Sequence, residues 1–381
     1  MTVEEIFYAM ALTRLNGIGL IPKLQLYKQV GSAQKIFEYK NDIRQIVPDC
    51  SDRLVEAIKF SDESIEKAKL ELDFAVKHQI QCLCYADEAY PYRLKECDDA
   101  PIVLYYKGSA NLNQSKIISM VGTRQCTQYG KDLINRFFSN LKYYCPNVLV
   151  VSGLAYGIDV AAHRSALQNN YETVGVLAHG LDQIYPSSHR NTAIEMLQQG
   201  GLLTEYMSET NADKQNFVSR NRIVAGMSDA TIVVESAAHG GSLITASLAQ
   251  GYNRDVFAFP GSVFSEFSEG CNNLIRDNSA ALVNNAEDFI QSTISMVQAQ
   301  TFEDWEMILV EDHSKDDTRE ILYDMRENTL DKRLKFIFLD NNKDGPAPAR
   351  NEGVEAATGR YIAYLDADDV WDRHKLERTL E

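Results

Sequence analysis

Apolar residues recur at helical spacing through the first 75 residues of the chain. One set includes Ile6, Met10 and Leu15, and a second set begins at Leu20 and Leu24. Spacings of three and four residues place such side chains on one face of a helix. The pattern therefore predicts a small, purely helical region over residues 1–75.

A glycine-containing turn, Gly17-Ile18-Gly19, interrupts these helical patterns. Such a turn can place backbone N–H groups against a DNA phosphate, as helix-hairpin-helix modules do. It can equally be a tight connection between two helices, and Lys23 is the one basic residue that follows closely. The sequence leaves the two interpretations open.

Short apolar runs, each ending in a glycine, an acid or a hydroxyl residue, alternate with helical patterns from residue 115 to residue 285. They follow two strand-like runs within residues 80–107. Runs of this length separated by helices predict a parallel, doubly wound sheet that is buried on both faces. Binding loops of such a sheet lie at the carboxyl ends of its strands, so we expect the glycine turns to converge on one crevice. The runs span residues 117–121, 148–151, 173–177, 201–204, 230–234 and 255–258.

The pattern changes after residue 290. A new strand is predicted over residues 305–310, a turn over 341–346 and another strand over 361–365, which ends in acidic residues. We therefore divide the chain into a helical domain at 1–75, a Rossmann-like domain at 76–290 and a third segment at 291–381.

Composition limits the possible classes of protein. The chain has 381 residues, 45% of them hydrophobic, and a formal net charge of −16. A protein coated in basic residues is excluded, but a local arginine cluster can still act within a Debye length of about 8–10 Å. The seven cysteines show no CxxC spacing, which favours reduced thiols in a cytoplasmic protein. The first residues do not resemble a signal peptide, and we expect no membrane association.

Three glycine-containing loops follow predicted strands, and each can bind an anion. Gly122-Thr123-Arg124 combines a permissive turn with a hydroxyl and a guanidinium. The stretch 152–159, which begins with Ser152 and Gly153, leaves a helix N-terminus open to an anion. The stretch 240–245, which contains Gly241 and Ser242, opens another helix in the same way.

The segment 216–226 is the most informative stretch of the chain. Arg220 and Arg222 flank Asn221 and lie close to Phe217. Guanidinium groups hold phosphates, and an aromatic ring stacks on a base. The sequence therefore predicts one positively charged crest that binds a nucleic acid.

Hydrolytic chemistry lacks a convincing set of residues. Ser152, Ser242 and His163 do not form a credible catalytic triad on sequence grounds, and we expect His163 to be an ordinary helical residue. Small-nucleotide hydrolases of the lysine-decarboxylase-like group carry a comparable loop with a threonine and a catalytic glutamate. No carboxylate follows Thr245 here, which disfavours that reaction.

These motifs together resemble the DNA-processing protein A family, also called DprA or Smf. The resemblance covers about residues 1–290 and implies a sterile-alpha-motif-like helical domain followed by an extended Rossmann domain. It implies a homodimer without enzymatic activity that binds single-stranded DNA and loads the RecA recombinase in natural transformation. The matching pieces are Tyr90-Pro91, Gly122-Thr123-Arg124, residues 152–159, Gly180-Leu181-Asp182, Tyr185-Pro186, residues 217–222, 241–245 and 256–261.

The resemblance also implies which residues contact DNA. His239 is a departure, since such proteins often have lysine there; it removes a permanent charge and could make affinity rise on acidification. The implied DNA-binding residues are Gly122, Thr123, Arg124, Ser152, Gly153, Phe217, Arg220, Asn221, Arg222, His239, Gly241 and Ser242.

Residues from about 292 resemble part of a family 2 glycosyltransferase, on pieces such as 300–306, 345–353 and 359–368. That resemblance implies a glycosyltransferase-A-like α/β segment in which Asp366 and Asp368 hold Mg²⁺ or Mn²⁺ and a sugar nucleotide. The family's first nucleotide-binding strand and its acceptor half have no counterpart in the sequence. We therefore expect an incomplete segment without transferase activity, and no cofactor unless it is active.

Overall fold

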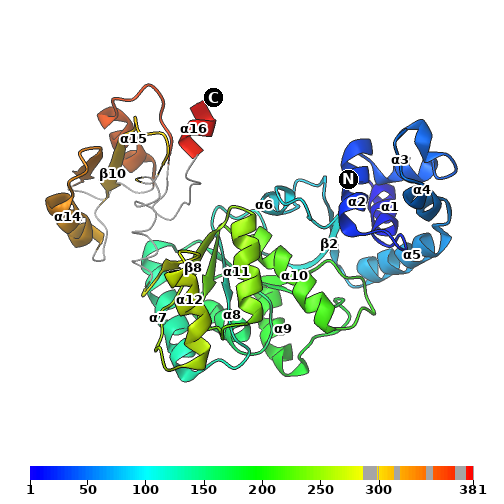
Figure 1. Ribbon diagram of the computed structural model, residues 1–381, viewed down its shortest axis with the longest axis horizontal. Helices are drawn as coiled ribbons and strands as arrows, with labels where there is room; N and C mark the ends of the chain where they lie inside the picture. The colour runs from blue at the N-terminus through cyan, green and yellow to red at the C-terminus, as the bar shows by residue number, and fades with distance from the viewer. Residues whose placement is uncertain (286–297, 299, 313–317, 340–345, 365–374, 381) are drawn as a thin grey trace. The chain divides into compact units, whose positions relative to one another are not determined.

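The computed structural model describes residues 1–381 except 286–297, 299, 313–317, 340–345, 365–374 and 381 (Figure 1). The chain forms two compact units, Met1–Asn285 and Ala286–Glu381. The domain boundaries at residues 75 and 290 stay predictions.

The first unit begins with five α-helices and a short 3-10 helix, η1. Side chains of Thr2, Ser32 and Ser51 accept a hydrogen bond from a backbone N–H in the first turn of α1, α3 and α4, so the sequence itself sets these helix starts. The elements are α1 (Val3–Thr13), α2 (Leu20–Val30), α3 (Ala33–Glu38), η1 (Ile43–Gln45), α4 (Asp52–Lys59) and α5 (Asp62–Lys77).

The glycine turn between α1 and α2 connects two packed helices. Gly17 adopts a φ of 71°, in the left-handed region that favours glycine. Lys23 is buried, and its Nζ donates a hydrogen bond to the carbonyl of Thr13 at 2.7 Å. Burial lowers the pKa of Lys23 to about 8. The ammonium of Lys23 is therefore used inside the protein. This favours a tight helix–helix connection over a turn that contacts a DNA phosphate.

A sheet of nine strands forms the centre of the described part of the first unit, in the order β1-β2-β6-β5-β4-β3-β7-β8-β9. The strands β1 and β2 pair antiparallel, as do β2 and β6, and all the other neighbours are parallel. The prediction of an α/β fold with a large parallel sheet is confirmed. The strands are β1 (Gln81–Cys84), β2 (Val103–Gly108), β3 (Ile117–Val121), β4 (Leu149–Ser152), β5 (Thr173–Val176), β6 (Gly200–Thr204), β7 (Ala230–Val233), β8 (Asp255–Ala258) and β9 (Ala281–Leu282).

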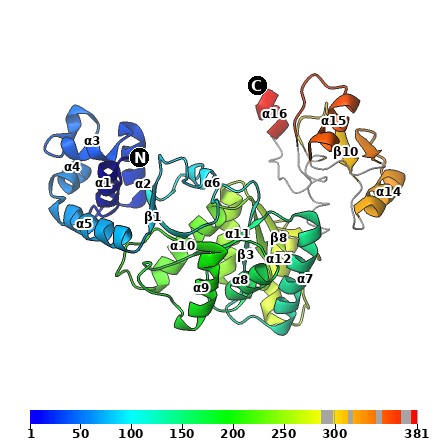
Figure 2. The same cartoon turned by 180° about the vertical axis from the view of Figure 1, so that it is seen from behind.

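Helices cover the sheet in two groups. The helices α7 (Gln128–Tyr144), α8 (Ile158–Gln168) and α9 (Arg190–Gln198) pack against one another in sequence. The helices α10 (Lys214–Gly226) and α11 (Gly241–Gly251) pack together, and α12 (Glu269–Arg276) contacts β8. Because βαβ crossovers are right-handed, the two groups of helices lie on opposite faces of the sheet (Figures 1 and 2).

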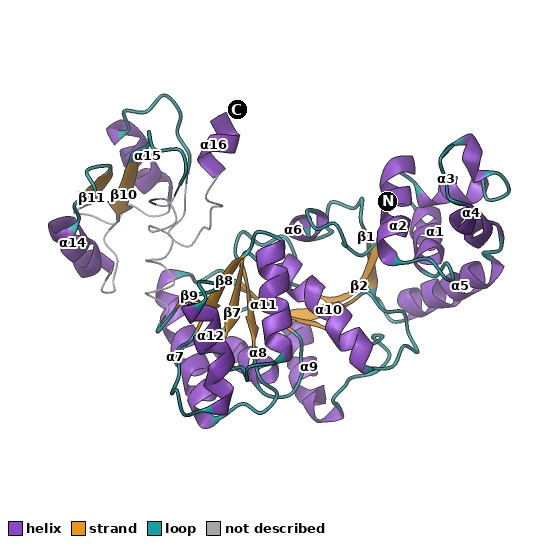
Figure 3. Ribbon diagram, viewed as in Figure 1, coloured by secondary structure: helices purple, strands orange, loops and turns teal. Residues whose placement is uncertain are grey.

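The strand order reverses beside β3. The chain runs outward from β3 to β6 and then returns through α10 to β7, which pairs with β3 on its other side. Figure 3 shows strands β7, β8 and β9 of this sheet among the helices of the first unit. Ligand crevices of open α/β sheets lie at such a reversal, outside the carboxyl ends of the strands. Every residue of β3, β4, β5, β6 and β7 is buried, as expected for strands covered on both faces.

The seven cysteines form no disulfide. Burial raises the pKa of the Cys82 thiol to about 12 and that of Cys271 to about 12, so neither is a reactive thiolate at neutral pH. In the described residues, no helix is both long and apolar enough to cross a membrane.

The second unit contains a parallel pair of strands, β10 (Met307–Glu311) and β11 (Leu334–Phe338), with α14 (Thr318–Asn328), α15 (Pro346–Ala356) and α16 (Lys375–Leu380). The strand predicted at 305–310 is confirmed within two residues. The strand predicted at 361–365 is wrong over its described residues, 361–364, which are irregular. Tyr361 and Tyr364 are 68% and 58% exposed, so this apolar run is not packed as a strand. The turn predicted at 341–346 lies outside the described residues except for Pro346.

Candidate nucleic-acid interface

Three loops at the carboxyl ends of β3, β4 and β7 are hydrogen-bonded to one another. The N–H of Thr123 donates to the carbonyl of Glu235 at 2.7 Å, and the N–H of Ile158 donates to the carbonyl of Thr123 at 3.1 Å. A Cβ on Gly122 would lie 2.4 Å from the Ile158 side chain and 2.8 Å from the Glu235 carbonyl oxygen. The glycine therefore permits the close approach that joins the loops. Gly122 is not among the described glycines with a positive φ, so its role is space and not the unusual backbone turn that the sequence suggested.

Gly157 begins the helix that follows β4. Its φ is 79°, and a Cβ there would lie 2.1 Å from the carbonyl oxygen of Thr123. An L side chain at this position would be strained and would also push the two loops apart. Gly157 thus fixes the position of the N-terminus of α8 beside Arg124.

Arg124, in the loop after β3, and Phe217, on α10, are in contact at this edge of the sheet. The guanidinium carbon of Arg124 lies 4.9 Å from the centroid of the Phe217 ring, within the range of a cation–π contact. Tyr185 places its ring 5.8 Å from that of Phe217 at an interplanar angle of 57°. Arg124 and Tyr185 are exposed, and Phe217 is half-buried on α10. Aromatic rings beside an exposed cation suit the stacking of a base next to its phosphate.

Arg220 is buried, at 3% exposure, and does not lie on the surface of the crevice. Its Nη1 donates to the carbonyls of Gly153, at 2.6 Å, and of Val176. Burial raises the pKa of Asp159 and the charge of Arg220 opposes that rise. This arginine joins the carboxyl ends of β4 and β5 through these two hydrogen bonds. The expectation that it contacts phosphate directly needs correction, because its donors are used inside the protein.

Arg222 is turned away from the crevice. Its guanidinium pairs with Glu205 at 2.5 Å and lies 4.0 Å from a carboxylate oxygen of Asp99. Residues two apart on a helix point to nearly opposite sides, so Arg222 and Arg220 cannot both face one ligand. The expected grouping of Arg220, Asn221 and Arg222 around one pocket is therefore not what the structure shows. Asn221 is half-buried and accepts from Arg220 Nε at 3.4 Å.

The two predicted serines use their hydroxyl groups inside the fold. Ser152 Oγ donates to the carbonyl of Met120 at 2.6 Å, and Ser242 Oγ donates to Ser236 Oγ at 2.9 Å. Both serines are buried. A Cβ on Gly153 would lie 2.4 Å from Arg220 Nη2, so this glycine makes room for the buried arginine. These three residues shape the loops, and the expectation that the hydroxyls contact DNA needs correction.

The start of α11 remains open. His239 and Gly241 are exposed, and no atom lies within 4 Å of a Cβ built on Gly241. The N-cap residue Gly240 offers no side chain to the free N–H groups of the first turn. A helix N-terminus in this state can accept an anion.

His163 has no catalytic role in this geometry. It is fully buried, and its Nδ1 lies 2.7 Å from Thr173 Oγ1. Burial lowers its pKa to about 3, so the imidazole is neutral at physiological pH. The sequence predicted that His163 is an ordinary helical residue, and it is a buried residue of α8.

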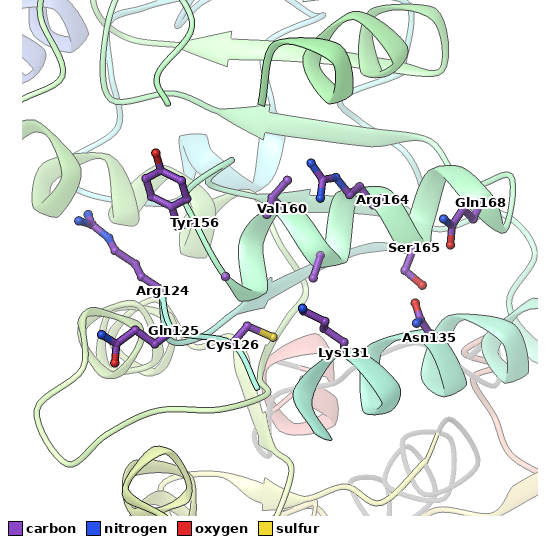
Figure 4. A pocket seen from close by; sticks show the side chains of 12 residues that line it. Arg124, Gln125, Cys126, Lys131, Asn135, Tyr156, Val160, Arg164, Ser165 and Gln168 are labelled. Carbon is purple, nitrogen blue, oxygen red and sulfur yellow. The ribbon is translucent and has the colours of Figure 1, made fainter. Parts of the chain in front are cut away.

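Sequence reasoning missed several polar residues near Arg124. Lys131 on α7 and Arg164 on α8 line a cavity that Arg124 also lines (Figure 4). Lys214 is exposed in the first turn of α10, one turn before Phe217. These are common residues of helix surfaces, and only their position relative to the loops distinguishes them.

In the second unit, Glu311 is buried and its carboxylate lies 3.0 Å from Arg319 Nη1. The predicted metal ligands, Asp366 and Asp368, lie outside the described residues.

Comparison with known proteins is consistent with this geometry. The family model for DNA recombination-mediator protein A matches residues 81–294, more than half of the chain. The chain belongs to the DNA recombination-mediator protein A family. It is 38% identical to DNA processing protein DprA of Streptococcus pneumoniae over 204 residues, which are 54% of this chain and 71% of that protein.

Two solved structures of family members resemble this one. The X-ray structure of DprA from Streptococcus pneumoniae has a TM-score of 0.64 and 30% identity, and the match covers 76% of this chain and 98% of that one. The second structure, with a TM-score of 0.51 and 29% identity over 57% of this chain and 96% of that one, was described for the single-stranded DNA binding mode of DprA from Helicobacter pylori.

The C-terminal segment matches a different family. The model for glycosyl transferase family 2 matches residues 282–381. A protein of Bacillus subtilis named for teichuronic acid biosynthesis, the glycosyltransferase TuaG, is 45% identical over 97 residues. That match covers 26% of this chain and 37% of the other protein. A family 2 glycosyltransferase-like segment is therefore present in this chain.

Proposed function

We propose that this protein is a single-stranded DNA-binding recombination mediator that protects incoming DNA and loads RecA in natural transformation. The observation that carries the proposal is the placement of Arg124 over Phe217 at the reversal of strand order, beside the open start of α11. A base can stack on Phe217 while Arg124 and the N–H groups of α11 hold the flanking phosphates. The described binding of single-stranded DNA by the Helicobacter pylori relative supports it.

The direct contacts in this proposal are fewer than the sequence suggested. Arg124, His239 and Gly241 offer exposed groups, and Phe217, Gly122 and Thr123 are half-buried. The buried arginines and serines hold these groups in place. With a net charge of −16 on the whole chain, the local cations must act at short range.

We further propose that the protein acts as a cytoplasmic homodimer and that this function needs no cofactor or catalysis. A filter-binding or fluorescence anisotropy titration with matched single- and double-stranded oligonucleotides tests DNA binding. We expect tighter binding of the single strand, with affinity falling as salt increases by a slope of about −0.7 per phosphate contacted. Equal or absent binding of the two forms would refute the proposal. RecA loading is tested by strand exchange on DNA that is pre-coated with single-stranded DNA-binding protein.

A second candidate function, sugar-nucleotide-dependent glycosyl transfer, is favoured by the match at residues 282–381. Asp366 and Asp368 would bind Mg²⁺ or Mn²⁺ and a nucleotide diphosphate. Calorimetric titration of the whole chain with a uridine diphosphate sugar, with and without Mn²⁺, tests it. Metal-dependent heat that disappears in Asp368→Asn would support this activity, and no heat with any nucleotide sugar would argue against it.

A further inference from the structure

A cavity of about 460 Å³ lies between α7 and α8, immediately beside the loop of Arg124. Lys131 and Asn135 face it from α7, and Arg164 and Ser165 face it from α8 (Figure 4). The described residues that line it include three cations and no aspartate or glutamate. In an acidic protein this is a local site for an anion.

The cavity also contains a buried hydroxyl that has no partner. Ser165 is 1% exposed, and its Oγ makes no hydrogen bond within the protein. Unpaired buried polar groups are uncommon because each costs desolvation energy. Arg164 lines the same cavity, and its Nε donates to Thr192 Oγ1 on α9 at 3.1 Å. The cavity is thus lined by guanidinium groups and an ammonium, and the unpartnered hydroxyl of Ser165 is buried in its wall.

Arg124 connects this cavity to the aromatic rings of Phe217 and Tyr185. The same side chain lines the cavity and lies over the Phe217 ring. A polynucleotide whose base stacks on Phe217 therefore lies beside a side chain, Arg124, that also lines the cavity of Lys131 and Arg164. The volume is in the usual range for a small-ligand site, and the amides of Gln125, Asn135 and Gln168 can accept or donate at a base edge.

We infer that the α7–α8 cavity binds a further nucleotide of the single strand held at Phe217, with Lys131 and Arg164 on its phosphate. This rests on the proposed function and extends the DNA path from the sheet edge onto the surface of the two helices. Free mononucleotide has the same chemistry, so the experiment has to separate the two sources.

Fluorescence anisotropy of the full chain tests the inference with oligo-dT of graded length. The test variant is Lys131→Gln with Arg164→Gln, both exposed residues, and the control is Arg136→Gln, which is also exposed on α7 but does not line the cavity. Lys131→Gln alone, which disturbs no hydrogen bond of Arg164, is measured as well. Melting curves establish that each variant is folded.

We expect the double variant to bind a 20-mer about 10-fold more weakly than wild type and to lose about 0.7–1.4 from the salt slope, as for one or two phosphates. Binding of the shortest oligomers that occupy Phe217 alone should be unchanged. A double variant that matches Arg136→Gln at every length would overturn the inference while leaving the proposed function intact.

Titration with deoxyadenosine 5′-monophosphate separates the sources. No displacement of the 20-mer by the mononucleotide at millimolar concentration is expected, because the strand gains from its contact with Phe217. Tight mononucleotide binding that the double variant abolishes would show a free-nucleotide site and would overturn the assignment to the strand. If the wild-type chain binds no single-stranded DNA at all, the proposed function and this inference fail together.

Discussion

The guanidinium of Arg124, from the loop after β3, lies 4.9 Å from the ring of Phe217, from α10. These residues are far apart in the chain and meet where α10 carries the chain back from β6 to β7, the neighbour of β3 in the sheet. An exposed cation beside a half-buried ring lets one site use stacking and phosphate attraction together.

Phe217→Ala should weaken single-stranded DNA binding by about 5- to 150-fold, because stacking of a base on an aromatic ring contributes about 1–3 kcal/mol. Anisotropy titration at fixed salt measures the change. Val218→Ala is the control, since Val218 is the exposed neighbour on the same helix. The salt slope should stay constant in Phe217→Ala because no charge is lost. Equal affinity of the two variants would remove Phe217 from the interface.

Arg222→Ala should act on stability and not on DNA contacts. Removing one partner of the buried pair with Glu205 leaves an uncompensated carboxylate, which costs about 3–5 kcal/mol. Urea denaturation followed by circular dichroism measures the free energy of unfolding. Arg124→Ala is the matched case, because Arg124 is exposed; it should change stability by less than about 0.5 kcal/mol and weaken DNA binding. The reverse pattern would contradict the assignment of the two arginines.

Gly157→Ala should destabilise the first unit by about 1–3 kcal/mol, because φ is positive there and the added Cβ would meet the Thr123 carbonyl. It should also weaken DNA binding, since the same movement displaces Arg124. Gly241→Ala tests the opposite case, because a Cβ there meets no atom within 4 Å. Thermal melting compares the stability of the two variants. Similar falls in melting temperature at both positions would show that the space around the added Cβ and the backbone φ do not determine the loss of stability.

His163 should make stability depend on pH. Its folded-state pKa of about 3 is below the ordinary value of 6.5, so the unfolded chain binds one more proton between those values. Its contribution to stability is therefore present above pH 6.5 and is lost as pH falls, by about 1.4 kcal/mol per pH unit. Urea denaturation at pH 7.5, 6.0 and 5.0 measures the slope in wild type and in His163→Asn.

Asn can occupy the bond to Thr173 but does not titrate, so His163→Asn should show a flatter pH profile even where its overall stability is lower. Asp159 is also buried and has a raised pKa, and its contribution is common to both proteins. Parallel slopes in the two proteins would show that His163 is not protonated on unfolding.

The order of strands and helices in the first unit could be predicted from the sequence, because apolar runs of strand length alternate with helical periodicity there. The glycine turns could also be placed at strand ends, as with Gly122 and Gly157. The predicted strand at 361–365 shows the limit of this reasoning. An apolar run forms a strand only where a neighbouring strand can pair with it and other side chains can bury its apolar face.

The amino-acid pattern was enough to predict the α/β fold, the loops at one sheet edge and the presence of an aromatic ring and cations near them. Which of these cations are exposed and which are buried followed from the folded arrangement alone. Arg220 and Arg222 look equivalent in the sequence, yet one supports two strand ends and the other pairs with Glu205. Lys131 and Arg164 look ordinary, yet they face one cavity. The reason is physical: the availability of a charge depends on the direction of its side chain and on neighbours that are distant in the chain.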